Sequence, residues 1–378
     1  MRDGWVEYKF KDVATAVKGK LPKNKNEDGI GIPYLTANFL RSSKPDYWIE
    51  NIEGAVTAED GDCLILWDGA GAGDLFSAHR GVVSSTMAVV TTQNSKIFRE
   101  FLTLFISSKA EYIKETCRGT TVPHVSPDAI ANMDLKIPPL SEQKRIVDLI
   151  SSVDSYIEGL QQQLESAKRS RNAVLHELLT AGGEGWVETK LGLIAEFVMG
   201  QAPLGERCNK EGNGTPFVKA GEFGENRPEI VEWTTDPLKM AKHSDVLVCV
   251  VGATAGKINL GADCAIGRSV AAIQPSKKLN QFYLYYLLSL ELSNLRSGSR
   301  GSAQGVITKD DLYRIPVRLP SIEEQNVTVS IVSSIDNFID HVTSTLKHVN
   351  NLRSGLLSDL LSGEHQIPES YDKVMGAA

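Results

Sequence analysis

The chain has 378 residues, 42% of them hydrophobic and 23% charged, and a chain of this length usually folds as two or three domains rather than one. Its composition excludes a disordered chain, a collagen-like chain and a small disulfide-stapled domain. With 40 lysines and arginines against 47 aspartates and glutamates, the formal charge is −7, which disfavours a protein that coats nucleic acid by bulk charge but leaves room for a local basic surface.

Targeting segments and disulfides are not indicated. No apolar run approaches the roughly 20 residues of a membrane-spanning helix, and residues 1–10 lack the basic and apolar regions of a signal peptide, so we expect a cytoplasmic protein. The five cysteines show no CxxC spacing, and Cys63 and Cys249 lie in apolar runs typical of buried strands. We therefore expect structural thiols rather than metal ligands.

The dominant feature of the sequence is an internal repeat with a period of about 182 residues. Gly4-Trp5-Val6-Glu7 recurs as Gly185-Trp186-Val187-Glu188. Residues 62–66 recur as residues 245–249, and both runs lead into a loop of small residues, which is typical of a buried strand followed by a turn. The sequence therefore predicts two copies of one folding unit.

Each copy ends in a segment that reads as a long helix, residues 141–182 in the first copy and 323–362 in the second. Apolar positions recur there in steps of four and three, from Ile146 to Leu178 and from Thr328 to Leu360, which is the spacing of a coiled-coil seam. A narrow seam needs a helical partner, so we predict that the two helices pack antiparallel on each other. About 39 residues would make a rod on the order of 58 Å long.

A single arginine interrupts the seam at the same place in both helices, Arg171 in the first and Arg353 in the second. A buried polar residue can fix the register and the partner of a coiled coil at a cost in stability. Alternatively, each guanidinium reaches into solvent at the edge of the seam. The sequence leaves both interpretations open.

The resulting fold class is α+β, with two mixed α/β domains that are each followed by a long helix. We predict the first domain over residues 1–140 and the second over residues 183–322. Residues 363–378 are expected to form a disordered tail.

Searches for catalytic motifs fail. Residues 252–257 are one residue short of a phosphate-binding loop, and residues 137–140 lack the polar and aromatic groups of an amino-methyltransferase site. The seven histidines show no metal-ligand spacing, and no serine lies in a G-x-S-x-G elbow. We therefore expect a binding protein with no catalytic residue, metal or cofactor of its own.

Polar loops favour recognition as the task of the two domains. Lysines cluster in residues 18–25, where they either keep the loop solvated or contact phosphates. Residues 118–124 of the first copy and 300–305 of the second combine glycine with Arg, His or Gln side chains that can bond base edges.

At this point the residues resemble the specificity subunit of Type I restriction-modification systems, from residue 4 to about residue 362. The most specific pieces are residues 138–147 and 185–192, and residues 245–257 with 268–271 are also similar. The sequence departs from the family pattern at Pro320-Ser321, where a double proline is usual, and in the loop at residues 68–73, which no lysine follows.

The resemblance implies that each domain reads one half of a split DNA target while the helix pair sets the gap between the halves. Two methyltransferase subunits would dock beside the helices, and motor-nuclease subunits would join for cleavage. S-adenosylmethionine, ATP and Mg²⁺ would belong to those partners.

The same resemblance implies DNA contacts in both domains. In the first domain we assign them to Lys20, Arg41, Arg80, Ser85, Thr86, Arg118, Thr121 and His124. In the second we assign them to Gln201, Lys219, Thr254, Lys257, Arg268, Ser269, Arg300 and Gln304.

Two other classes of protein compete with this interpretation. A coiled-coil adaptor whose heads bind proteins is favoured by the negative charge, and a self-sufficient nuclease or methyltransferase with an unrecognised site is disfavoured by the failed searches. The charge argument weakens on inspection, because residues 141–180 and 323–362 together hold 7 basic and 11 acidic side chains and so contribute −4 of the −7. The domains themselves are near neutral and can carry basic faces.

Overall fold

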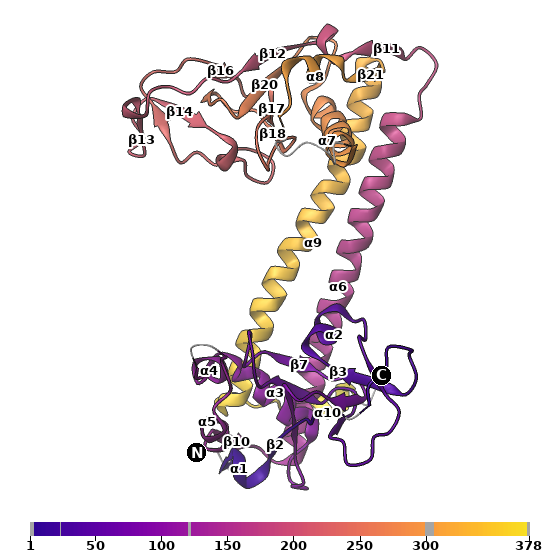
Figure 1. The fold of residues 1–378 in the computed structure, drawn as a ribbon, viewed down its shortest axis with the longest axis vertical. Coiled ribbons are helices and arrows are strands. Elements are labelled where there is room, and N and C mark those ends of the chain that lie inside the picture. Colours follow the sequence, from indigo (N-terminus) through magenta and orange to yellow (C-terminus); the bar gives the residue numbers. More distant parts are fainter. Residues whose placement is uncertain (1–3, 23, 120–121, 299–305, 376–378) are drawn as a thin grey trace. The chain divides into compact units, whose positions relative to one another are not determined.

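The structure, a computed structural model, describes residues 4–22, 24–119, 122–298 and 306–375. The chain divides into two compact units, unit 1 (Met1–Gln161 with Thr345–Ala378) and unit 2 (Gln162–Ser344). This division differs from the expected one, because each long helix contributes one part to each unit (Figure 1).

Unit 1 contains the strands of the first repeat. They are β1 (Val6–Lys9), β2 (Thr15–Lys18), β3 (Ile32–Leu35), β4 (Trp48–Ile49), β5 (Thr57–Ala58), β6 (Cys63–Leu66), β7 (Leu75–Ser77), β8 (Gly81–Val83), β9 (Met87–Thr91) and β10 (Asp134–Ile137). They form one four-stranded sheet in the order β2-β9-β6-β7, another in the order β4-β3-β8-β5, and the pair β1-β10. Only β3 and β8 pair in parallel among these strands.

The helices of unit 1 come from both repeats. They are α1 (Phe10–Val13), α2 (Ala37–Ser42), α3 (Arg99–Ser108), α4 (Ala110–Glu115), α5 (Pro127–Ala131), the first part of α6 (Leu140–Thr180), the last part of α9 (Ile322–Ser362) and α10 (Tyr371–Met375). One core cluster joins Ile65 of the sheet and Phe101 of α3 to Ile150 of α6 and Leu357 of α9. The strands and short helices of unit 1, which we call its head, thus share one hydrophobic core with the helix pair. The strands and short helices of unit 2 are called the head of that unit in the same way.

Unit 2 repeats this plan. Its strands are β11 (Val187–Lys190), β12 (Ala195–Met199), β13 (Cys208–Asn209), β14 (Thr215–Val218), β15 (Trp233–Thr234), β16 (Met240–Ala241), β17 (Val246–Cys249), β18 (Ile258–Leu260), β19 (Cys264–Ile266), β20 (Val270–Pro275) and β21 (Pro316–Leu319). The sheets β12-β20-β17-β18 and β13-β15-β14-β19-β16 and the pair β11-β21 correspond to those of unit 1, with β13 as an additional edge strand. This correspondence confirms the predicted repeat.

The remaining helices of unit 2 are short, apart from one. They are η1 (Leu191–Leu193), η2 (Gly205–Arg207), η3 (Ala220–Glu222), α7 (Gln281–Gly298) and α8 (Lys309–Arg314). Leu175 and Leu179 of α6 and Val332 of α9 are buried in one cluster with Tyr283 and Leu287 of α7. As in unit 1, the core of the head includes residues from both long helices.

The long helices begin and end close to the predicted bounds, and α6 ends at Thr180 rather than at residue 182. The helix α6 starts directly after Pro138-Pro139, and α9 starts after Pro320-Ser321. At Ser321 a reciprocal cap replaces the second proline. The Ser321 hydroxyl accepts a hydrogen bond from the Glu324 amide (3.3 Å), and the Glu324 carboxylate accepts one from the Ser321 amide (2.9 Å).

Within each unit the helices pack antiparallel, as predicted. In unit 1 the guanidinium of Arg353 forms a two-pronged ion pair with Asp154, with Nη2 to Oδ2 at 2.8 Å. In unit 2 Arg171 forms the equivalent pair with Asp336, with Nε to Oδ1 at 2.6 Å and Nη2 to Oδ2 at 3.4 Å. The arginines lie 182 residues apart and so do the aspartates, so the same register recurs in both units.

These pairs decide between the two interpretations of the arginine that interrupts the seam. The side chains of Arg171 and Arg353 are 22% and 25% exposed, and each is bound to a carboxylate of the other helix. In unit 2 the hydroxyl of Tyr286 also donates to Asp336 (3.0 Å). Two-pronged charge-assisted hydrogen bonds are geometrically specific, so the arginine fixes register rather than reaching into solvent.

The most repeated motifs of the sequence join each head to the start of its helix. Buried Gln143 accepts a hydrogen bond from the Phe98 amide (2.7 Å) and donates to the carbonyls of Lys96 and Pro138 (both 2.8 Å). Gln325 makes the same three bonds in unit 2, with Asn280 (2.8 Å), Lys278 (2.9 Å) and Pro320 (3.0 Å). Each glutamine therefore satisfies three backbone groups that burial would otherwise leave unpaired.

The repeated tryptophan belongs to the same junction. The indole of Trp5 donates to Glu142 (3.2 Å), and that of Trp186 donates to Glu324 (3.3 Å). The Gly-Trp and Glu-Gln motifs, which lie more than 130 residues apart in each copy, thus meet at one place.

The expectation of a disordered tail is wrong for the part of residues 363–378 that the structure describes. Ile367 is 5% exposed, and α10 follows it. Arg145 of α6 donates two hydrogen bonds to the carboxylate of Asp372 (2.8 and 3.0 Å). The apolar Ile367 and the ion pair hold the tail on the helix.

Two further expectations concern the cysteines and membrane segments. Cys63, Cys249 and Cys264 are buried thiols, and burial raises the pKa of Cys63 and of Cys264 to about 12. Over the described ranges, every helix is too short or too polar to cross a bilayer.

We predict that Gln143→Leu destabilises the protein by about 2–5 kcal/mol, because an apolar side chain leaves one buried amide and two buried carbonyls without partners. Gln161→Leu, at an exposed position of the same helix, is the matched control and should change the free energy of unfolding by less than about 0.5 kcal/mol. Denaturant unfolding of the full chain measures both. Equal stabilities of the two variants would show that the junction does not need the glutamine.

Candidate nucleic-acid interface

One edge of the main sheet of unit 1 gathers several loops. Leu66 of β6 pairs with Met87 of β9, and Lys18 of β2 pairs with Ala88, so three strands end or begin at this edge. The loop at residues 67–74, the turn at residues 84–86 and the residues after β2 therefore meet there.

Backbone hydrogen bonds hold these segments together. The amide of Gly19 donates to the Met87 carbonyl (2.9 Å), and that of Trp67 donates to the Thr86 carbonyl (2.7 Å). The segment that ends at His124 joins the same edge, because His124 forms backbone bridges with Asp68 and Arg118.

The structure brings most of the predicted contacts of the first domain to this edge. Lys20, Thr86, Arg118 and His124 are exposed there, and Ser85 is half-buried with its amide bonded to the Tyr34 hydroxyl (3.1 Å). Arg41 reaches the edge through its ion pair with Asp74 (2.7 Å). Thr121 lies outside the described residues.

Arg80 is not part of this group. Its amide bonds Asp60 (2.8 Å) and its guanidinium lies 3.9 Å from Glu59, which places it before β6, at the opposite end of that strand from the loop at residues 67–74. Arg80 and the contacts beside Asp68 therefore lie at opposite ends of β6, which the sequence alone could not show.

Unit 2 presents the equivalent edge with different side chains. Gly200 bonds the Val270 carbonyl (2.9 Å), and the Val250 amide bonds the Ser269 carbonyl (2.8 Å), which repeats the two bonds of unit 1. Gln201 follows Gly200 directly, and Arg268 precedes Ser269 in the turn before β20.

The second domain also has a pocket at this edge, with a volume of about 450 Å³. It is lined by Ala202, Lys219, Val251, Gly267, Arg268 and Ser269. Three of the predicted contacts thus lie together, and Thr254 is exposed in the adjacent loop. Arg300 and Gln304 lie outside the described residues.

Lys257 and Lys219 are held by local partners. The Lys257 ammonium donates to the Phe223 carbonyl (2.6 Å), so it caps a backbone group of its own domain. Lys219 is bound to Glu232 and lies 4.0 Å from Glu222, and the hydrogen bond with Glu232 raises its pKa. Lys219 therefore stays protonated, but nearby carboxylates offset its charge.

Acidic partners of the basic side chains are what the sequence analysis missed. Lys18 pairs with Asp68 (2.5 Å), and Lys114 joins Arg41 on Asp74 (3.1 Å). Burial opposes ionisation of Asp74, but hydrogen bonds from Lys114 and Arg41 outweigh it and lower the pKa of the carboxyl. These pairs reduce the positive charge of this edge, which can still supply specific hydrogen bonds.

Arg118 and Arg268 differ from these residues. Both side chains are exposed, and neither forms an ion pair with any residue that the structure describes. A guanidinium with unused donors can bond a guanine edge or a phosphate. These two arginines are the strongest candidates for direct contacts, one in each unit.

Two glycines that the sequence analysis did not single out shape the edge. A Cβ on Gly19 would lie 2.1 Å from the Val83 carbonyl oxygen, and one on Gly200 would lie 2.1 Å from that of Gly267. The backbone can pass the turn only without a side chain. Gly19 and Gly200 occupy equivalent positions of the repeat, just before Lys20 and Gln201, and this recurrence could have identified them from the sequence.

Metal ligands do not gather at these edges in the part of the chain that the structure describes. Across the described residues, no group of three His, Cys, Asp or Glu side chains is placed to hold a metal ion. The arrangement offers hydrogen-bond donors and acceptors on a rigid scaffold, which suits recognition.

Comparison with known proteins agrees with this arrangement. Residues 2–169 and residues 183–351 each match the family model of the Type I restriction modification DNA specificity domain, so the chain belongs to this family and contains the domain twice. The resemblance seen in the sequence is thereby confirmed.

Named relatives and a solved structure cover almost the whole chain. The Type I restriction enzyme MjaVIII specificity subunit of Methanocaldococcus jannaschii is 25% identical over 97% of this chain and 94% of that protein. The Type I restriction enzyme EcoBI specificity subunit of Escherichia coli is 24% identical over 96% and 87%. The S subunit of a Type I restriction-modification system from M. genitalium shares the fold, with a TM-score of 0.61 at 16% identity over 94% of this chain and 96% of that chain.

We predict that Gly200→Ala lowers the free energy of unfolding by about 1–3 kcal/mol, because the new methyl group must push backbone apart. Gly221→Ala, which meets nothing within 4 Å, is the control and should be nearly neutral. Thermal unfolding of both variants measures the difference. A Gly200→Ala variant as stable as the control would contradict the close approach at this turn.

Proposed function

We propose that the chain is the DNA-specificity subunit of a Type I restriction-modification complex, in which each head reads one half of a split DNA site. One observation carries this proposal. Two copies of a single scaffold present different side chains at equivalent positions, Lys20 against Gln201, Ser85 against Arg268 and Thr86 against Ser269. One scaffold that carries different side chains at equivalent exposed positions suits two domains that recognise different DNA sequences.

The chemistry of the edges supports direct readout. Sequence is read by hydrogen bonds to base edges, whereas phosphate contacts position the protein. Because Lys18 and Lys114 at the first edge are paired with carboxylates, affinity would rest on exposed donors such as Arg118 and Arg268. The net negative charge is then no obstacle, since it lies largely on the long helices.

The helix pair would set the spacing between the half-sites. Protein length converts to base pairs at about 3.4 Å per step of duplex, and the two-pronged ion pairs keep the helices from sliding. A constant spacing between the half-sites requires that the two helices keep one register.

The chain would act as a non-catalytic recognition subunit in the cytoplasm, with two methyltransferase subunits and motor-nuclease subunits as partners. S-adenosylmethionine, ATP and Mg²⁺ would be bound by those partners. Exposed aromatic residues at equivalent positions, Tyr156 (55% exposed) and Phe338 (49%), support a partner that binds twice.

The test is to co-express the chain with its cognate methyltransferase subunit and to sequence the methylated genome. We expect a bipartite site. Arg118→Ala should relax one half and Arg268→Ala the other, each by about 1–3 kcal/mol of discrimination, because each removes one exposed guanidinium from one head.

Arg80→Ala is the matched control. It removes an arginine of the first domain that lies at the opposite end of β6 from the loop at residues 67–74, and it should leave both halves unchanged. A contiguous methylated site would contradict the proposal. Absence of sequence-specific methylation, with only non-specific DNA binding, would favour the adaptor alternative. Methylation by the chain alone would favour an enzyme.

A further inference from the structure

The two repeats differ on one helix face, and the difference concerns exposed apolar area. In unit 2, Val327, Ile331 and Phe338 of α9 are 59%, 40% and 49% exposed. Their spacing of four and seven residues places them on one side of the helix, and we call this set the α9 face. Over the described residues nothing else in the helix pair of unit 2 exposes three large apolar side chains in one row.

The equivalent residues of α6 in unit 1 are Arg145, Leu149 and Tyr156, which we call the α6 face. Here the tail covers the first two. The Arg145 side chain is only 8% exposed and bonds Asp372 (2.8 Å), while Leu149 packs on the cluster that also holds Ile367 and Tyr371. Tyr156 remains 55% exposed.

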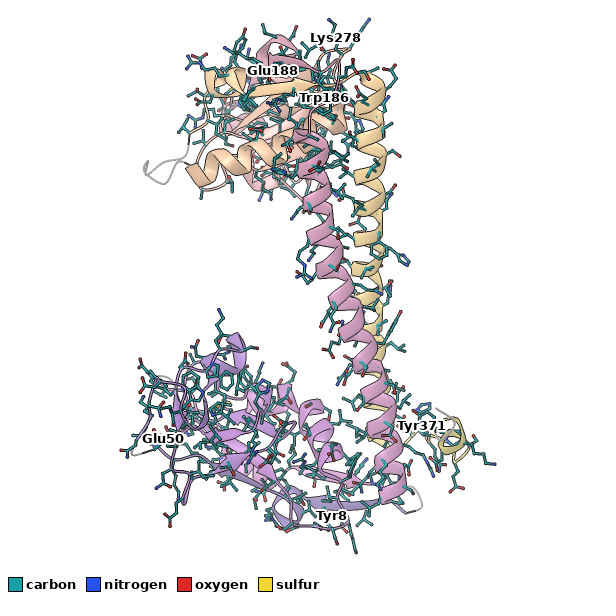
Figure 2. The ribbon with its side chains drawn as sticks, turned by 90° about the vertical axis from the view of Figure 1, so that its right-hand side faces the viewer. Tyr8, Glu50, Trp186, Glu188, Lys278 and Tyr371 are labelled. Atoms are coloured by element: carbon teal, nitrogen blue, oxygen red, sulfur yellow. The ribbon has the colours of Figure 1, made fainter. Side chains whose placement is uncertain are left out.

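The position of the tail is visible in the side-chain view. Tyr371 lies beside the helices, on the side away from the sheets of unit 1 (Figure 2). In unit 2 the segment that follows α6 enters β11 at Val187 instead, so it forms no comparable cover. The same helix face is thus covered in one repeat and open in the other.

The tail also shows what kind of group this face binds. It supplies one buried aliphatic side chain, Ile367, and then a short helical turn with Tyr371. Only the ion pair is peculiar to unit 1, because Val327 stands in unit 2 where Arg145 stands in unit 1. An occupant of the α9 face therefore needs apolar side chains and no carboxylate.

We propose that the C-terminal tail is a built-in competitor for the second methyltransferase subunit on the α6 face, whereas the α9 face is open to apolar side chains of the first. This inference rests on the proposed function. Because the second subunit must displace the tail, its apparent affinity is its intrinsic affinity multiplied by the fraction of molecules in which the face is open. The two docking steps are therefore unequal although the repeat is symmetric.

The experiment titrates the full chain with the purified cognate methyltransferase subunit and follows stoichiometry by native mass spectrometry and calorimetry. We expect two steps of different affinity. Removal of residues 364–378 should tighten the weaker step by at least about tenfold and leave the tighter step unchanged. Asp372→Arg repels Arg145 without shortening the chain, so it should also tighten the weaker step. This variant tests the proposal if the truncated chain does not fold.

Phe338→Asp should weaken the tighter step by about tenfold or more, because it puts a charge into an apolar contact. Asn337→Asp adds the same charge one position away, about 100° around α9 from Phe338 and outside the row of the α9 face, and is the matched control that should leave both steps unchanged. Two equal steps in the wild type, or steps insensitive to both tail variants, would overturn the proposal.

Two other outcomes separate this inference from its premises. No binding of the methyltransferase subunit by the wild type would contradict the proposed function itself. Self-association of the chain alone that disappears with the tail would show instead that a second copy's tail fills the α9 face, which also overturns the proposal.

Discussion

The ion pairs between the two long helices are the constraint on which the rest of the structure depends. Arg353 with Asp154 and Arg171 with Asp336 fix one antiparallel register at equivalent places in both units. Each head needs that register, because its hydrophobic core includes residues of both helices: Ile150 and Leu357 in unit 1, and Leu179 and Val332 in unit 2. Neither repeat is a self-contained domain. A slip of one helix along the other would open both cores, at a cost larger than the roughly 0–1 kcal/mol of a typical surface ion pair.

Within each head, the residues that fix the backbone are the same in both repeats, whereas the side chains exposed at the edge of the sheet differ. Buried glutamines and tryptophans join head to helix in the same way twice, and Gly19 and Gly200 let the backbone pass the turn in the same way twice. The side chains that follow these glycines differ between the repeats. A family of readers can change such side chains without disturbing the core, because their exposed positions carry little packing energy. This separation accounts for a repeat whose framework matches and whose edges do not.

Sequence reasoning recovered what depends on local pattern and failed where distant residues meet. The repeat, the long helices and the recurring arginine were visible because their spacing is written along the chain. The partner of that arginine was not, because Asp336 lies 165 residues from Arg171. The lysine-rich loop at residues 18–25 was interpreted as basic although Asp68 pairs with its Lys18, and Arg80 was grouped with residues from which strand direction separates it. The tail read as disordered because a short polar segment gains order only from a surface elsewhere, here Arg145.

A charge-reversal cycle on the ion pair in unit 1 tests whether these pairs set the register of the helices. Denaturant unfolding would be measured for the wild type, Arg353→Asp, Asp154→Arg and the double variant. We predict that each single reversal lowers stability and that the double reversal restores most of the loss, with a coupling energy of about 1–3 kcal/mol. A double variant whose loss equals the sum of the two single losses would contradict the account.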